Sequence, residues 1–122
     1  SSAASDVYKR QDDAKAVQEA GASMLVLECV PADLAAKITK TLHIPTIGIG
    51  AGNQCDGQVL VYQDMLGMFT DYVPKFVKQF AGVGETMKKA FKEYMEEIQS
   101  GAFPAEEHSY KIDDEVIERL YF

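Results

Sequence analysis

The segment Met24–Pro31 has the sequence MLVLECVP, and it decides how the rest of the chain is interpreted. Its first four residues are apolar without alternation, a pattern typical of a parallel strand covered on both faces. The fifth residue is Glu28, so a carboxylate follows the strand with no polar transition. An ionised carboxylate is costly to bury unless a neighbouring group uses it. Glu28 is therefore the first candidate for a functional residue.

Helices and strands are predicted to alternate on both sides of this segment. Upstream, apolar residues recur every three positions over 12–20, which predicts a short helix that Gly21 ends. Downstream, apolar residues at helical spacing over 34–42 predict a second helix. The apolar runs 46–49 and 59–61 predict two further buried strands. Short connections between such elements predict a right-handed parallel α/β arrangement.

The second half of the chain is predicted to be helical from Tyr72 onward. Apolar residues lie on one face of the segment 87–98, with lysines and glutamates on the other, and Gly101 closes this amphipathic helix. We expect the charged face to be solvated and the Met and aromatic stripe to be core or a subunit contact. Asp113–Leu120 is predicted to add a short terminal helix behind an Asp113 cap.

Composition restricts the classes of partner. The chain has 122 residues, 47% hydrophobic and 25% charged, which is typical of a globular domain. Its formal net charge is -7, and an acidic chain repels a phosphate backbone, so we expect no nucleic-acid partner. Its apolar runs are far shorter than the ~20 residues of a spanning helix, so we expect no membrane partner. Cys29 and Cys55 lack zinc-site spacing, which favours reduced thiols and a cytoplasmic location.

The first eleven residues, Ser1–Gln11, show no apolar periodicity. They are similar to the in-frame translation of a transposase adapter used in preparing DNA libraries. We therefore expect residues 1–11 to be a non-native, adapter-derived segment. Residues 12–122 are then the native part, and the N-terminal part of the natural chain is missing.

Three other features of the sequence are candidate functional sites. The glycine-rich stretch 48–57, GIGAGNQCDG, could bind an anion through its amides, but it lacks both the dinucleotide fingerprint and the P-loop ending. Its pattern favours a loop between two strands, with a turn rather than a metal site at Asp56. His43 lies at a helix end, where we expect a structural role. His108 is either a metal or acid–base group or, as we favour, an exposed tail histidine.

Glu28 itself has two interpretations that its position does not separate. In a parallel α/β fold it lies at the carboxyl end of the sheet or barrel, where active sites collect, so it could act as a general base. A base at this position needs its pKa raised by burial or by another acid. Alternatively, Glu28 satisfies the first amides of the helix that follows.

Five segments taken together resemble the ketopantoate hydroxymethyltransferase family. They are LVLECVP (25–31), IPTIGIGAGNQCDGQVLV (44–61), QDMLGM (63–68), VPKFVKQF (73–80) and GAFPAEEHSY (101–110). The resemblance covers Asp12–Tyr110. It implies an α/β fold, namely the C-terminal portion of a (β/α)8 TIM barrel of the phosphoenolpyruvate/pyruvate superfamily type, with the N-terminal half missing.

The resemblance also implies a reaction. Enzymes of this family add a hydroxymethyl group from 5,10-methylenetetrahydrofolate to 3-methyl-2-oxobutanoate, giving 2-dehydropantoate in pantothenate biosynthesis. They use Mg2+ to stabilise an enolate and a glutamate to accept the proton, and that glutamate matches Glu28. The family's magnesium ligands fall in the missing half, so no residue here is assigned to metal. We expect a keto acid and a folate as partners, a homo-oligomer at full length, and no activity from this fragment alone.

Two alternatives stay open. One is a lyase or mutase of the phosphoenolpyruvate/pyruvate superfamily, which the specific run 48–58 disfavours. The other is a non-enzymatic module, in which the glycine stretch holds an anion and the helix 87–98 docks a partner. The module predicts that Asp12–Phe122 folds independently, whereas the fragment interpretation predicts that it does not.

Overall fold

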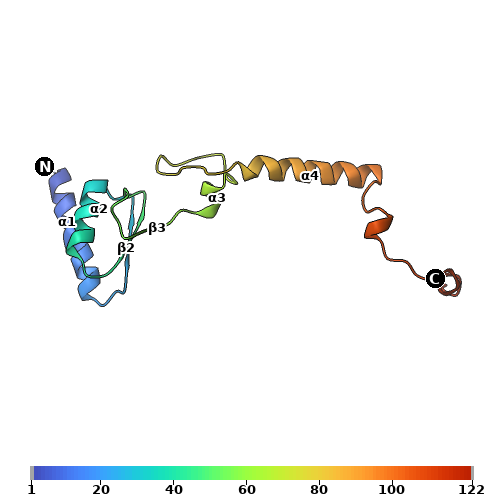
Figure 1. Cartoon of the computed structure of the whole chain (residues 1–122), viewed down its shortest axis with the longest axis horizontal. Coiled ribbons are helices and arrows are strands. Elements are labelled where there is room, and N and C mark those ends of the chain that lie inside the picture. Colours follow the sequence, from blue (N-terminus) through green and yellow to red (C-terminus); the bar gives the residue numbers. More distant parts are fainter. Residues whose placement is uncertain (1, 122) are drawn as a thin grey trace. The chain divides into compact units, whose positions relative to one another are not determined.

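The computed structural model describes residues 2–121, which divide after residue 81 into two compact units (Figure 1). The first unit contains α1 (Ser2–Glu19), β1 (Leu25–Glu28), α2 (Ala32–Thr41), β2 (Thr46–Ile49), β3 (Gly57–Gln58) and α3 (Tyr62–Met65). The second contains α4 (Val83–Ser100), the 3-10 turn η1 (Glu106–His108) and α5 (Asp114–Glu118).

The first unit is built on a three-stranded parallel sheet in the order β1-β2-β3. Leu25 of β1 pairs with Thr46 of β2, and Glu28 pairs with Ile49. Because α2 connects these two parallel strands, β1, α2 and β2 form a βαβ unit. The predicted α/β class with parallel strands is confirmed in this form.

A small core lies between the sheet and the helices α1 and α2, which pack side by side (Figure 1). Its buried members are Ala14, Leu27, Ala35, Ile38, Leu42 and Ala51. Only one face of β1 is covered, because Leu27 is 5% exposed whereas Val26 is 54% exposed. The expectation that both faces of the run Met24–Leu27 are buried is therefore wrong. No other described element of this unit supplies a second covering layer.

The helix α1 begins at Ser2, ten residues before the expected helix start at residue 12. Its predicted end is confirmed, since Gly21 has φ 98° and its N–H donates to the carbonyl of Gln18 at 3.0 Å. The side chain of Gln18 then accepts hydrogen bonds from the backbone N–H groups of His43 and Ile44. These bonds fasten the end of α1 to the turn before β2. The adapter origin of residues 1–11 stays a prediction, and Ser1 lies outside the described residues.

The glycine-rich stretch is a tightly packed crossover between β2 and β3, as the loop interpretation predicted. Parallel strands usually need a dozen or more residues to connect them, and here residues 50–56 suffice. Ala51 is 1% exposed, so this crossover contributes to the core. Gly52 has φ 76°, and a Cβ at this position would lie 2.5 Å from the Cβ of Ala32. The glycine therefore lets the crossover pack directly against the start of α2.

The predicted third strand at 59–61 is wrong. The strand β3 comprises only Gly57 and Gln58, and pairing ends with the hydrogen bond from the Val59 N–H to the Gly48 carbonyl. Val59 and Val61 are 47% and 49% exposed. The chain then turns into the one-turn helix α3.

The second unit is mainly the helix α4. It begins at Val83 rather than near Tyr72, and it ends at Gly101, whose φ of 78° is the predicted left-handed C-cap. The apolar stripe forms no core within this unit, since Phe91 is 61% and Met95 is 59% exposed. The short terminal helix α5 follows Asp113, whose side chain makes no capping hydrogen bond. Within residues 2–121, no helix combines the length and apolarity required to cross a membrane.

Candidate active site

Glu28 is the last residue of β1, so its carboxylate lies at the carboxyl end of the parallel strands, as predicted. The side chain is exposed and makes no hydrogen bond or ion pair with the residues that the structure describes. It does not bond the first amides of α2, whose N-cap position is Pro31 and has no side-chain cap. The helix-capping interpretation is therefore wrong, and the carboxylate is available to a ligand.

Glu28 lines a hollow of about 290 Å³ between α1 and β1. The wall is largely apolar, and its other residues are Arg10, Asp13, Ala14, Val17, Leu25, Val26, Leu27, Cys29, Val30, Pro31 and Ile38. Arg10 and Asp13 form an ion pair at 3.9 Å on α1. Sequence reasoning did not find Asp13 or Arg10, because their approach to β1 depends on how the helix packs. Arg10 also lies in the segment set aside as adapter-derived.

The turn that follows Glu28 has an unusual backbone. Cys29 has φ 53°, and among residues 2–121 it is the one non-glycine residue with a positive φ. Its N–H donates to the carbonyl of Ile49 at 2.9 Å, so the β1–β2 ladder continues through it. Its thiol is free and exposed. The residue directly after the candidate base is thus held in a rarely populated conformation.

Comparison with known proteins identifies the family of this chain. A family model described as "Ketopantoate hydroxymethyltransferase" matches residues 2–106. The chain belongs to this family. The resemblance inferred from the sequence segments is thereby confirmed.

Individual members of the ketopantoate hydroxymethyltransferase family match closely over part of their length. A 3-methyl-2-oxobutanoate hydroxymethyltransferase from Clostridium novyi is 64% identical over 110 residues, which cover 90% of this chain and 40% of the relative. One of the same name from Enterococcus faecalis is 61% identical over 108 residues, covering 88% of this chain and 39% of the relative. The chain thus spans about 40% of the length of these relatives.

The described part of the chain contains no cluster of metal-ligating side chains. Within residues 2–121, no group of three His, Cys, Asp or Glu side chains could hold a metal ion. In the hollow, Glu28 and Asp13 are the two carboxylates, and Asp13 is already paired with Arg10. Mg2+ is usually held by one or two carboxylates together with waters and substrate oxygens, and in this hollow only Glu28 has no ion-pair partner among the described residues.

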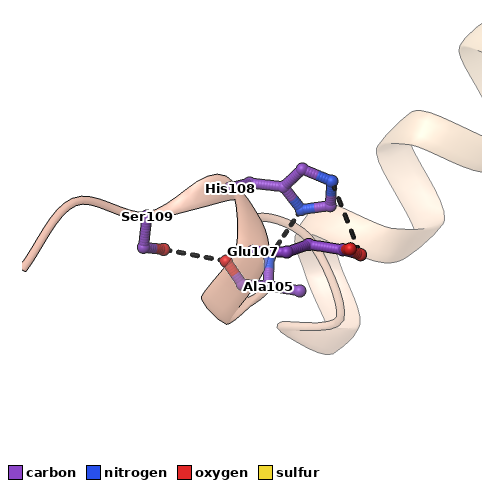
Figure 2. Close-up of polar contacts among 4 residues, drawn as sticks. All are labelled: Ala105, Glu107, His108 and Ser109. Carbon is purple, nitrogen blue, oxygen red and sulfur yellow. Dashed lines mark hydrogen bonds and ion pairs between the residues drawn. The ribbon is translucent and has the colours of Figure 1, made fainter.

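The two histidines have structural contacts. His43 is exposed just after α2 and is held through its backbone N–H rather than its ring. Figure 2 shows that the His108 ring folds back over its own turn, where Nδ1 accepts a hydrogen bond from the Ala105 N–H at 3.1 Å. Ser109 donates to the Ala105 carbonyl, and the His108 ring lies 5.0 Å from that of Phe103. His108 is exposed and stabilises the turn η1, which favours the exposed tail histidine over metal or acid–base chemistry.

Proposed function

We propose that this chain contributes the proton-accepting residue, Glu28, to a 3-methyl-2-oxobutanoate hydroxymethyltransferase of pantothenate biosynthesis. The observation that supports this most directly is the Glu28 carboxylate at the carboxyl end of β1, which lines the hollow without a partner among the described residues. Family membership favours this transferase over the lyase and over the binding module. The single-carbon donor in the proposal is 5,10-methylenetetrahydrofolate.

The proposed role of Glu28 is removal of the proton from C3 of the keto acid. A carboxylate oxygen takes the proton, and the C3–H electron pair moves into the C2–C3 bond, so negative charge develops on the ketone oxygen. The resulting nucleophilic carbon then forms a bond to the methylene carbon of 5,10-methylenetetrahydrofolate, and the two bonds from that carbon to the folate nitrogens break. Water supplies the hydroxyl oxygen, and tetrahydrofolate leaves with one hydrogen from C3 and one from water on its nitrogens. In the family a magnesium ion stabilises that charge, and in this proposal its ligands belong to a part of the enzyme outside this chain.

The proposal also concerns the architecture around Glu28. We take β1, β2 and β3, with the helices of 12–122, to be the C-terminal part of a single (β/α)8 barrel domain. A barrel of this type needs about 250 residues, and the chain spans 40% of its relatives, which is consistent with a partial barrel. The full-length enzyme is proposed to be a cytoplasmic homo-oligomer, and the isolated chain is proposed to be inactive.

The test of the proposed function uses a grafted enzyme, in which this chain replaces the 110 matched residues of the Clostridium novyi relative. Deuterium exchange at C3 of 3-methyl-2-oxobutanoate is followed by NMR. Glu28→Gln keeps the size of the side chain but removes the base, so we expect exchange to slow by roughly a hundredfold to ten-thousandfold. The matched control is Glu19→Gln, an exposed acid at the end of α1, which should leave exchange unchanged.

The same experiment can reject the assignment. If the Glu28→Gln graft binds the keto acid and exchanges the C3 proton as fast as the unsubstituted graft, Glu28 is not the proton acceptor. Magnesium affinity, measured in parallel, should be the same in both grafts because Glu28 is not proposed as a ligand.

A further inference from the structure

The connection between β1 and α2 must reverse the chain in three residues. The strand ends at Glu28 and the helix begins at Ala32, which leaves only Cys29, Val30 and Pro31. Pro31 has φ fixed at -51° by its ring, and a residue before proline is confined to extended conformations. The reversal therefore falls on Cys29, which adopts φ 53°.

Strand β2 fixes the backbone of Cys29 on its N-terminal side. Its N–H donates to the Ile49 carbonyl at 2.9 Å, while Glu28, one residue earlier, pairs with Ile49 in the parallel ladder. Both Glu28 and Cys29 line the hollow between α1 and β1. Because Ala35 and Ile38 hold α2 in the core, a change in φ at Cys29 would have to be taken up by rotating the peptide that links it to Glu28, which would redirect the carboxylate.

We propose that Cys29 is a positioning residue for Glu28. Its left-handed backbone, fixed by the Ile49 carbonyl, holds the Glu28 carboxylate at the hollow. This rests on the proposed function of Glu28 as the proton acceptor. The role belongs to the backbone conformation and not to the sulfur, because the exposed thiol makes no hydrogen bond with any described residue.

The choice of substitutions follows from backbone preferences. Glycine adopts a positive φ freely and asparagine does so more readily than most residues, whereas a β-branched residue strongly disfavours it. In the grafted enzyme, Cys29→Gly and Cys29→Asn should keep the kcat for C3 exchange within about threefold, since both retain the left-handed turn. Cys29→Val should lower kcat by about tenfold to a hundredfold, the effect of a small misplacement of the base. KM for the keto acid should change by less than about twofold in all three, because only the transition-state contact is disturbed.

A double-mutant cycle separates positioning from general damage to the fold. With Glu28→Gln already present, adding Cys29→Val should cause no further loss of the residual exchange, because Cys29 acts only through Glu28. If the Cys29→Val graft does not fold, Cys29→Ala takes its place in the cycle. Alanine is smaller but still disfavours the left-handed conformation, so it should exchange more slowly than the glycine variant.

Several results would overturn the proposal. One is equal kcat in the valine, alanine and glycine variants, and another is an equal further loss when Cys29→Val is added to Glu28→Gln. A loss of exchange in both Cys29→Gly and Cys29→Asn would assign the role to the thiol instead. The proposed function fails separately, through unchanged exchange in Glu28→Gln alone, whatever the Cys29 variants do.

Discussion

Gly52 shows how closely the first unit is packed around single residues. Two conditions apply at this position: a left-handed backbone with φ 76°, and a neighbouring Cβ, that of Ala32, only 2.5 Å from where a side chain would begin. Gly21 shares the first condition, with φ 98°, but has no atom within 4 Å of the same point. A comparison of substitutions at Gly52 and Gly21 therefore separates the conformational cost of adding a side chain from its steric cost.

We expect Gly52→Ala to lower the free energy of unfolding by about 3 kcal/mol, since backbone strain and overpacking both contribute. Gly21→Ala, the matched control, should cost only about 1 kcal/mol through strain alone. Chemical denaturation of the grafted enzyme measures both values. Equal losses for the two variants would mean that the contact with Ala32 is not tight in solution.

Residue positions differed in how far the sequence could predict them. The place of Glu28 could be predicted, because an apolar run followed directly by an acid and a helix is a local pattern. The conformation of Cys29 could not, because cysteine has no preference for a positive φ and the constraint arises from the length of the turn. Asp13 and Arg10 were missed since their proximity to β1 depends on packing between distant segments.

At the scale of elements, one polar cluster joins α2, β2 and the crossover. Thr46, the first residue of β2, is 0% exposed, and its Oγ1 lies 2.7 Å from Oγ1 of Thr39 on α2. The carboxylate of Asp56 accepts the Thr46 N–H at 2.8 Å. Thr46 is the first residue of the strand, and its buried N–H needs a hydrogen-bond acceptor. The Asp56 carboxylate is that acceptor.

Asp56→Ala should lower the free energy of unfolding of the grafted enzyme by about 1 to 3 kcal/mol, because the buried Thr46 amide loses its acceptor. Asp71→Ala is the control, since Asp71 is exposed and lies outside the helices and strands. Thermal or urea unfolding gives the comparison. A loss no larger for Asp56→Ala than for Asp71→Ala would show that water replaces the carboxylate.

The elements themselves were predictable where their pattern is local. The helix α2 and the strand β2 follow from apolar spacing within their own residues, and both were found at nearly the observed bounds. The run 59–61 is equally apolar, yet pairing with β2 ends with the hydrogen bond that the Val59 N–H donates, and no property of the valines reveals this. Likewise, the second face of β1 is exposed because no described element covers it, and the sequence of β1 does not reveal this.

At the scale of the whole molecule, apolar surface is the dominant feature. Val26 on β1 and Phe91, Met95 and Ile98 on α4 are all at least 44% exposed. Among residues 2–121, β1 and β3 each pair on one side only, which leaves both edges of the sheet open. Uncovered apolar surface and free strand edges promote association with other chains.

We therefore expect the 122-residue chain, expressed alone, to self-associate. Size-exclusion chromatography with light scattering should show species larger than the 13.4 kDa monomer. Phe91→Lys combined with Met95→Lys should shift the distribution toward monomer, because the exposed α4 stripe becomes charged. A monodisperse monomer that melts cooperatively would contradict the expectation and favour an independently folding module.

The brevity of the crossover 50–56 has a practical consequence for anyone modifying this protein. Its seven residues connect β2 to β3 and also place Ala51 in the core. The crossover therefore has no spare length in which an epitope or a reporter peptide could be inserted. An insertion there would pull β3 away from its neighbour. Residues 70–73 are exposed and lie between α3 and α4 outside any helix or strand, which makes them the better place for a tag.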